Sequence, residues 1–87
     1  MQAFVAGIEV HLKPGALDPQ GQAVGAGLRS LGYVGVTDVR VGKHLRVRLE
    51  AEDEAAARAA VQRMCQELLA NPVMETASFD VRPAPGP

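Results

Sequence analysis

Residues 4–12 alternate between apolar side chains and smaller or more polar ones, and this period of two limits the fold more than any other feature of the chain. Such a pattern is typical of a β-strand that buries one face and leaves the other partly exposed. Residues 38–41, 44–50 and 77–82 repeat the alternation, so the sequence predicts four strands. The apolar set of the first strand is Phe4, Ala6, Ile8, Val10 and Leu12.

Two helices are predicted between these strands. The first begins at Asp18, whose side chain can accept hydrogen bonds from the free amides of a helix start, and Pro19 suits the first helical position. Gly32 ends this helix. The second begins at the acidic residues 52–54, which complement the helix dipole, and ends before Pro72.

The order strand–helix–strand, repeated once, predicts an α+β fold. The expected architecture is a ferredoxin-like βαββαβ sandwich, with a four-stranded antiparallel sheet and two helices on one face. Gly42 and Lys43 are expected to form the tight hairpin turn between the second and third strands. Residues 1–82 form this single domain, and the Pro-rich residues 83–87 are expected to be a disordered tail.

Glycine is frequent inside the first predicted helix, at Gly21, Gly25 and Gly27. Each costs roughly 1 kcal/mol of helix stability relative to Ala, so these positions need a reason. Close packing of the helix on its own sheet is the simpler interpretation. The alternative is a flat helix surface that lets the backbone of a partner approach.

Composition excludes several classes of function. The formal net charge is −1 and no basic run occurs, which argues against binding to nucleic acid. No apolar run approaches the ~20 residues that span a bilayer, and no signal-peptide pattern opens the chain. We therefore expect a cytoplasmic protein with no membrane contact. The lone Cys65 lies in the apolar row of the second helix and is predicted to be a buried structural thiol.

Side chains suited to catalysis or metal binding are not grouped in any familiar pattern. The chain has no CxxC, no local Ser/His/Asp or Cys/His signature, and no glycine-rich loop between a strand and a helix. The central strands also lack the aromatic rings with which an RNA-recognition domain stacks bases. We predict no catalytic residue and no metal site. The sequence leaves the roles of His11, His44 and Cys65 open.

Three segments carry the most specific signal: residues 12–21 (LKPGALDPQG), 37–43 (TDVRVGK) and 65–75 (CQELLANPVME). With the LGY at residues 31–33, and in this order and spacing, they resemble the PurS family. This family is the small subunit of phosphoribosylformylglycinamidine synthase, also called formylglycinamide ribonucleotide amidotransferase. The resemblance runs from residue 9 to about residue 81, which is nearly the whole chain.

The resemblance implies a non-catalytic bridging subunit in de novo purine biosynthesis. In such a complex a glutaminase subunit releases ammonia from glutamine, and a large synthetase subunit uses ATP and Mg²⁺ to convert formylglycinamide ribonucleotide to the amidine. The small subunit is expected to hold the two together, assist ammonia transfer and bind no cofactor itself. The small size of the domain and the two edge strands of the predicted sheet separately favour self-association as a dimer or tetramer, with strands contributing to the contact. The motif positions expected at interfaces are Lys13, Pro14, Gly15, Asp18, Pro19, Gln20, Gly21, Lys43, Asn71 and Pro72.

Two other classes fit the size and the predicted topology. One is a free-standing ferredoxin-like module that binds a ligand and regulates another protein, and the other is a structural subunit of no further definition. The motifs LDPQG and LLANPV favour the resemblance to the PurS family over these two classes, because a generic ligand sensor has no reason to carry them.

Overall fold

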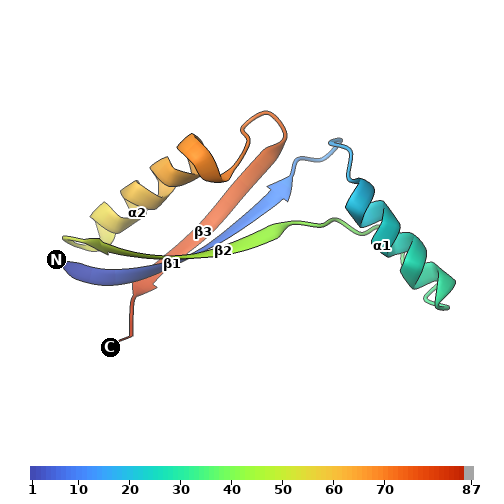
Figure 1. The fold of residues 1–87 in the computed structure, drawn as a ribbon, viewed down its shortest axis with the longest axis horizontal. Coiled ribbons are helices and arrows are strands. Elements are labelled where there is room, and N and C mark those ends of the chain that lie inside the picture. The colour runs from blue at the N-terminus through green and yellow to red at the C-terminus, as the bar shows by residue number, and fades with distance from the viewer. Residues whose placement is uncertain (86–87) are drawn as a thin grey trace.

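The computed structural model describes residues 1–85, which form a three-stranded antiparallel sheet with two α-helices (Figure 1). The sheet order is β2-β1-β3, so β1 is central, and Ile8 of β1 lies opposite Leu45 of β2 and Phe79 of β3. The α+β class and these elements agree with the prediction. Their bounds are β1 (Gln2–Leu12), α1 (Pro19–Ser30), β2 (Lys43–Ala51), α2 (Glu54–Met64) and β3 (Glu75–Pro83).

The core lies between α2 and one face of the sheet, which we name the inner face. The period of two in β1 directs its apolar residues to this side, as the sequence predicts. Ala57 of α2 is fully buried, and its small side chain lets the helix approach the sheet closely. The buried core residues are Phe4, Ala6, Ile8, Val10, Ala51, Ala57, Val61, Cys65 and Val81.

A short π-helical segment, η1 (Cys65–Leu69), continues α2 toward β3. The Ala70 N–H donates to the Cys65 carbonyl over 3.1 Å, which closes the wider turn. Cys65 is buried, as predicted, and this burial raises the pKa of its thiol. The helical region ends before Pro72, also as predicted.

Helix α1 does not lie on the sheet but projects beyond its end, on the side away from α2 (Figure 1). The chain is therefore elongated, with a radius of gyration of 16.8 Å, whereas a compact domain of this length would have about 12 Å. The prediction that both helices cover one face of the sheet does not hold for α1. Of its apolar side chains, Val24 is 44% exposed and Leu28 is half-buried, and Leu31 at its C-cap is 77% exposed.

The second of the four predicted strands, at residues 38–41, and the hairpin at Gly42–Lys43 are not formed within residues 1–85. Residues 37–42 instead run from α1 to β2 without joining the sheet. The backbone of Val41 donates to the side chain of Asp18 at the start of α1, over 2.9 Å. Gly42 also lacks the positive φ that a Gly-X hairpin turn requires.

The C-terminal residues follow the sheet further than predicted. β3 runs through Pro83, one residue past the expected domain limit, and the Ala84 N–H donates to the Ala3 carbonyl over 2.9 Å. Of the tail predicted at residues 83–87, residues 86 and 87 lie outside the described residues. In the described part of the chain, neither α-helix has the length and hydropathy needed to cross a membrane.

Candidate functional site

The three motif segments of the sequence meet at one end of the sheet, and we name their meeting point the junction (residues 12–21, 37–43 and 71–75). Lys13 joins two of them, because its N–H donates to the Met74 carbonyl (2.7 Å) and its Nζ to the Pro72 carbonyl (2.8 Å). Arg40 joins the third, since its Nη2 donates to the carbonyls of Lys13 and Ala16, each over 3.2 Å. Segments far apart in the sequence are thus bonded into one unit.

Asp18 is the centre of the junction and its only buried polar residue, with 4% of its surface exposed. One carboxylate oxygen accepts the Gly21 N–H (2.8 Å), which caps α1, and the other accepts the Val41 N–H (2.9 Å). The Arg40 Nε lies 3.8 Å from the same carboxylate. The bond from Val41, the bond from Gly21 and the charge of Arg40 together hold the pKa of Asp18 below its usual range.

The turn that leads from β1 into α1 has a defined type. The Ala16 N–H donates to the Lys13 carbonyl over 3.0 Å, and Gly15 between them has φ of 88°. A positive φ at the third position, after Pro14 at the second, is the signature of a type II turn.

Gly21 in α1 is needed for a different reason, which is close backbone packing. A Cβ there would lie 2.3 Å from the Val39 carbonyl oxygen, so only glycine lets the two backbones touch.

The C-terminal end of α1 is capped by hydrogen bonds, as its N-terminal end is. The Tyr33 N–H donates to the Leu28 carbonyl and the Gly32 N–H to the Arg29 carbonyl, with Gly32 at φ of 103°. This is a Schellman arrangement, as the sequence position of Gly32 predicts. The Arg29 Nη1 also donates to the Val36 carbonyl over 3.2 Å. Residues 36–41 therefore bind α1 along its length and fix its direction relative to the junction.

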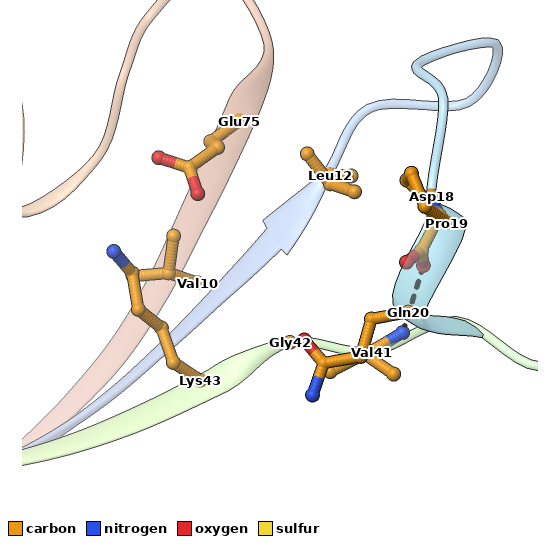
Figure 2. A pocket seen from close by; sticks show the side chains of 9 residues that line it. All are labelled: Val10, Leu12, Asp18, Pro19, Gln20, Val41, Gly42, Lys43 and Glu75. Atoms are coloured by element: carbon orange, nitrogen blue, oxygen red, sulfur yellow. Dashed lines mark hydrogen bonds between the residues drawn. The ribbon is translucent and has the colours of Figure 1, made fainter. Parts of the chain in front are cut away.

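A cleft of about 310 Å³ lies between the start of α1 and the uncovered end of the inner face (Figure 2). Gln20 borders it from α1, Lys43 from β2 and Glu75 from β3, and Leu12 and Val10 form its apolar part. The Glu75 Oε1 accepts the Asn71 N–H over 2.8 Å, which fixes this carboxylate at the rim. The cleft is wide open and offers contacts rather than enclosure, so it suits a protein surface better than a small substrate.

The structure brings the predicted site residues together at the junction, although their proposed roles at interfaces stay predictions. Two residues of this unit, Arg40 and Glu75, are not among the predicted site residues. The position of Arg40 in the TDVRVGK motif was the available signal. For Glu75 it was the end position of the LLANPVME motif. The predicted positions found in the junction are Lys13, Pro14, Gly15, Asp18, Pro19, Gln20, Gly21, Lys43, Asn71 and Pro72.

Residues 1–85 contain no group of three or more His, Cys, Asp or Glu side chains arranged to hold a metal ion. The histidines lie on the outer face of the sheet, opposite to α2, where His44 Nδ1 is 2.7 Å from Glu9 Oε1. His11 Nε2 is 3.9 Å from the other oxygen of the same carboxylate. All three side chains are at least half exposed, so this is a solvated surface cluster.

The family of the chain follows from the sequence as a whole together with this geometry. The family model of PurS, described as phosphoribosylformylglycinamidine (FGAM) synthase, matches residues 5–83, which include the whole junction. The chain belongs to the PurS family. The PurS subunit of phosphoribosylformylglycinamidine synthase from Synechocystis sp. is 50% identical over 74 residues, which are 85% of this chain and 74% of that protein. The PurS subunit from Bacillus subtilis is 42% identical, over 85% of this chain and 87% of the relative.

Solved PurS structures have the same shape. PurS of Thermus thermophilus superposes with a TM-score of 0.86 at 40% identity, over 95% of this chain and 99% of the other. Because nearly the whole chain is superposed, the likeness includes the projecting α1. A chain of the PurLQS structure from Thermotoga maritima superposes with a TM-score of 0.81 at 33% identity, over 97% of this chain and 100% of that one. A match to these subunits over the full fold removes the ground for a free-standing sensor.

Proposed function

We propose that this PurS chain is the non-catalytic bridging subunit of phosphoribosylformylglycinamidine synthase in de novo purine biosynthesis. It holds the glutaminase and the ATP-dependent synthetase subunits together while formylglycinamide ribonucleotide, glutamine and ATP are converted to formylglycinamidine ribonucleotide. The observation that carries the proposal is the helix α1, which is anchored by hydrogen bonds at the junction but left uncovered by the rest of the chain. Such a shape offers surfaces to other chains. ATP and Mg²⁺ belong to the synthetase subunit in this proposal, and the complex acts in the cytoplasm.

A shielded route for ammonia is the physical advantage of a bridge. Ammonia that escapes into water is protonated and diluted, whereas transfer between two docked sites keeps the free base at a high effective concentration. The small subunit assists this transfer by fixing the distance and direction between the two partner enzymes. The Asp18 and Arg40 bonds make the junction stiff enough for that task.

A second copy of the same chain is the partner that we propose for the exposed apolar part of α1 and the segment after it. Leu31, Tyr33 and Val34 are between 60% and 85% exposed, which is unusual for neighbouring large apolar residues of a monomer. We expect a dimer or a dimer of dimers at tens of micromolar. Leu31→Glu should shift sedimentation toward the monomer, whereas Leu68→Glu, equally exposed at 83% on η1, should not. A monomeric wild type would contradict the proposal.

Reconstitution tests the bridging function. We expect the purified chain to turn over neither glutamine nor ATP, and synthetase plus glutaminase to make amidine from glutamine only when the chain is added. With ammonium chloride as the nitrogen source, synthesis should depend much less on the chain, because no transfer between subunits is needed. If synthesis from ammonium requires the chain as strictly as synthesis from glutamine, the chain acts in the synthetase reaction itself and the bridging proposal fails.

A further inference from the structure

The outer face of the sheet carries a shallow groove of about 470 Å³ that the junction and α1 do not use. We name it the basic groove. Its lining includes three arginines and only one carboxylate, although the whole chain has a net charge of −1. Positive charge is therefore in excess within the groove, although Glu9 and Glu50 lie on the same face of the sheet outside its lining. The residues of the basic groove are Val5, Gly7, His44, Arg46, Arg48, Asp80, Arg82 and Pro85.

Two of the arginines have no carboxylate partner among residues 1–85. Arg82 is neutralised by Asp80, whose Oδ2 lies 2.6 Å from its Nη2, and this bond lowers the pKa of Asp80. Neither Arg46 nor Arg48 forms a salt bridge within the described residues, and Arg48 makes only one long bond, 3.4 Å, to the Pro85 carbonyl. The charge available to a partner is therefore that of Arg46 and Arg48.

Gly7 forms the floor of the groove and keeps this arrangement open. It lies between Arg46 of β2 and Asp80 of β3 in the register of the sheet. A Cβ at position 7 would be 2.7 Å from the Asp80 Oδ1. The absence of a side chain at Gly7 therefore lets the Asp80 carboxylate lie over the backbone of β1. The result is an open channel with a paired arginine on one wall and two unpaired arginines on the other.

The spacing of the unpaired arginines fits one kind of partner. They are two residues apart on one strand, so their side chains leave the sheet at positions about 7 Å apart. Carboxylates at alternate positions of an extended segment have the same spacing, and arginine binds carboxylates in a bidentate manner. We propose that the basic groove docks an extended acidic segment of another subunit of the same synthase complex. The proposal rests on the bridging function proposed above.

The test compares two variants with the same change in net charge. Arg46→Gln/Arg48→Gln removes the unpaired charge of the groove, and Arg58→Gln/Arg63→Gln removes two exposed arginines of α2. Binding of immobilised wild type and both variants to the purified synthetase and glutaminase subunits, each alone and then together, is measured at 50 and 250 mM NaCl. Melting curves establish that both variants fold as the wild type does.

We expect the groove variant to bind one of the two subunits at least tenfold more weakly at 50 mM NaCl and to lose most of the salt dependence. The α2 variant should stay within about twofold of the wild type. Equal binding by the groove variant and the wild type would overturn the docking proposal, while the bridging function would stand if wild type still joined the subunits. Loss of affinity equal to that of the α2 variant would likewise overturn it, because net charge alone would then explain the effect. Wild type that binds neither subunit would instead refute the bridging function.

The groove could also attract phosphate groups, and a competition measurement separates the two chemistries. A synthetic peptide with glutamate at alternate positions should displace the bound subunit from wild type more effectively than inorganic tripolyphosphate at equal charge concentration. Stronger displacement by tripolyphosphate would contradict a peptide-docking groove.

Discussion

The two helices of this small chain have opposite relations to the sheet. α2 covers the inner face with its fully buried Ala57 and Val61, and so contributes to a core of ordinary kind. α1 fully buries only Gly21 and Gly25, half-buries Leu28, and leaves most of its other side chains exposed. One helix is therefore held by apolar packing, whereas the other is held by caps and hydrogen bonds at its ends and along residues 36–41.

This difference separates two tasks within 87 residues. The α2 half provides stability, since burial of apolar surface is the main favourable contribution to folding. The α1 half presents an uncovered surface in a fixed orientation, and most of its side chains do not pack against the rest of the chain. A subunit that joins other proteins needs such a half, because surface buried within one chain is unavailable to a partner.

Removing a core side chain should have the largest effect. Ile8→Ala deletes a fully buried side chain beneath α2 and should lower the free energy of unfolding by about 2–5 kcal/mol. Leu31→Ala at the C-cap of α1 should change the free energy of unfolding of the isolated chain by less than about 0.5 kcal/mol, because Leu31 is 77% exposed. Urea unfolding of dilute protein measures both. Similar losses for the two variants would show that α1 is packed as α2 is.

The two helix caps should differ in the next largest effect. Asp18 accepts bonds from Gly21 and Val41, whereas Asp53 at the start of α2 is exposed and accepts one, from Ala56 over 2.8 Å. Asp18→Ala should therefore lower the melting temperature by roughly 4–8 °C, and Asp53→Ala by less. Near-equal shifts would mean that the bond to Val41 adds nothing to the junction.

Lowering the pH should destabilise the junction before it destabilises the core. The folded-state pKa of Asp18 is lowered by its backbone hydrogen bonds and Arg40, so the unfolded chain binds this proton more readily. The stability from Asp18 is thus fully present above the unfolded value, about pH 4, and is lost as pH falls below it. Asp18→Asn should flatten this acid loss in a titration followed by circular dichroism. Asp80→Asn should hardly alter it, because the Asp80–Arg82 pair is more than half exposed.

The smallest expected effect lies on the open side of α1. Apart from its chain neighbours and the backbone of α1 itself, nothing lies within 4 Å of a Cβ added at Gly27, so Gly27→Ala should raise the free energy of unfolding by about 0.5–1 kcal/mol through helix propensity alone. Gly21→Ala should act in the opposite direction, because its Cβ would meet the Val39 carbonyl. Thermal melts of both variants check the signs. A stabilised Gly27→Ala that assembles poorly would show that a partner backbone contacts this side of α1.

Local patterns were enough to predict most of the fold. The period of two in β1, the cap at Asp18, the stop at Gly32 and the end before Pro72 are each decided by residues close in sequence, and each prediction is confirmed. The sequence did not predict that the motif residues cluster at one place. This clustering depends on bonds between distant residues, such as the one from Lys13 to Pro72.

The failed predictions concern the same distant bonds. Val39 and Val41 alternate with polar residues like a strand, but the Val41 N–H is taken by Asp18, which is 23 positions away in the sequence. No periodicity in residues 38–41 signals that competitor. The place of α1 was mispredicted for a related reason: an apolar stripe on a helix requires a surface to cover it, but does not say whether that surface belongs to the same chain.

Hydrogen exchange measures the stability of each helix separately, so it can show whether α2 is stable within the chain while α1 depends on partners. In dilute isolated protein, the amides of α2 should exchange only with global unfolding, whereas those in the middle of α1 should exchange at least tenfold faster. In the complex with the synthetase and glutaminase subunits, protection of α1 should rise to that of α2. If α1 is already as protected as α2 in the dilute chain, and gains nothing in the complex, the division into a self-sufficient half and a partner-dependent half is wrong.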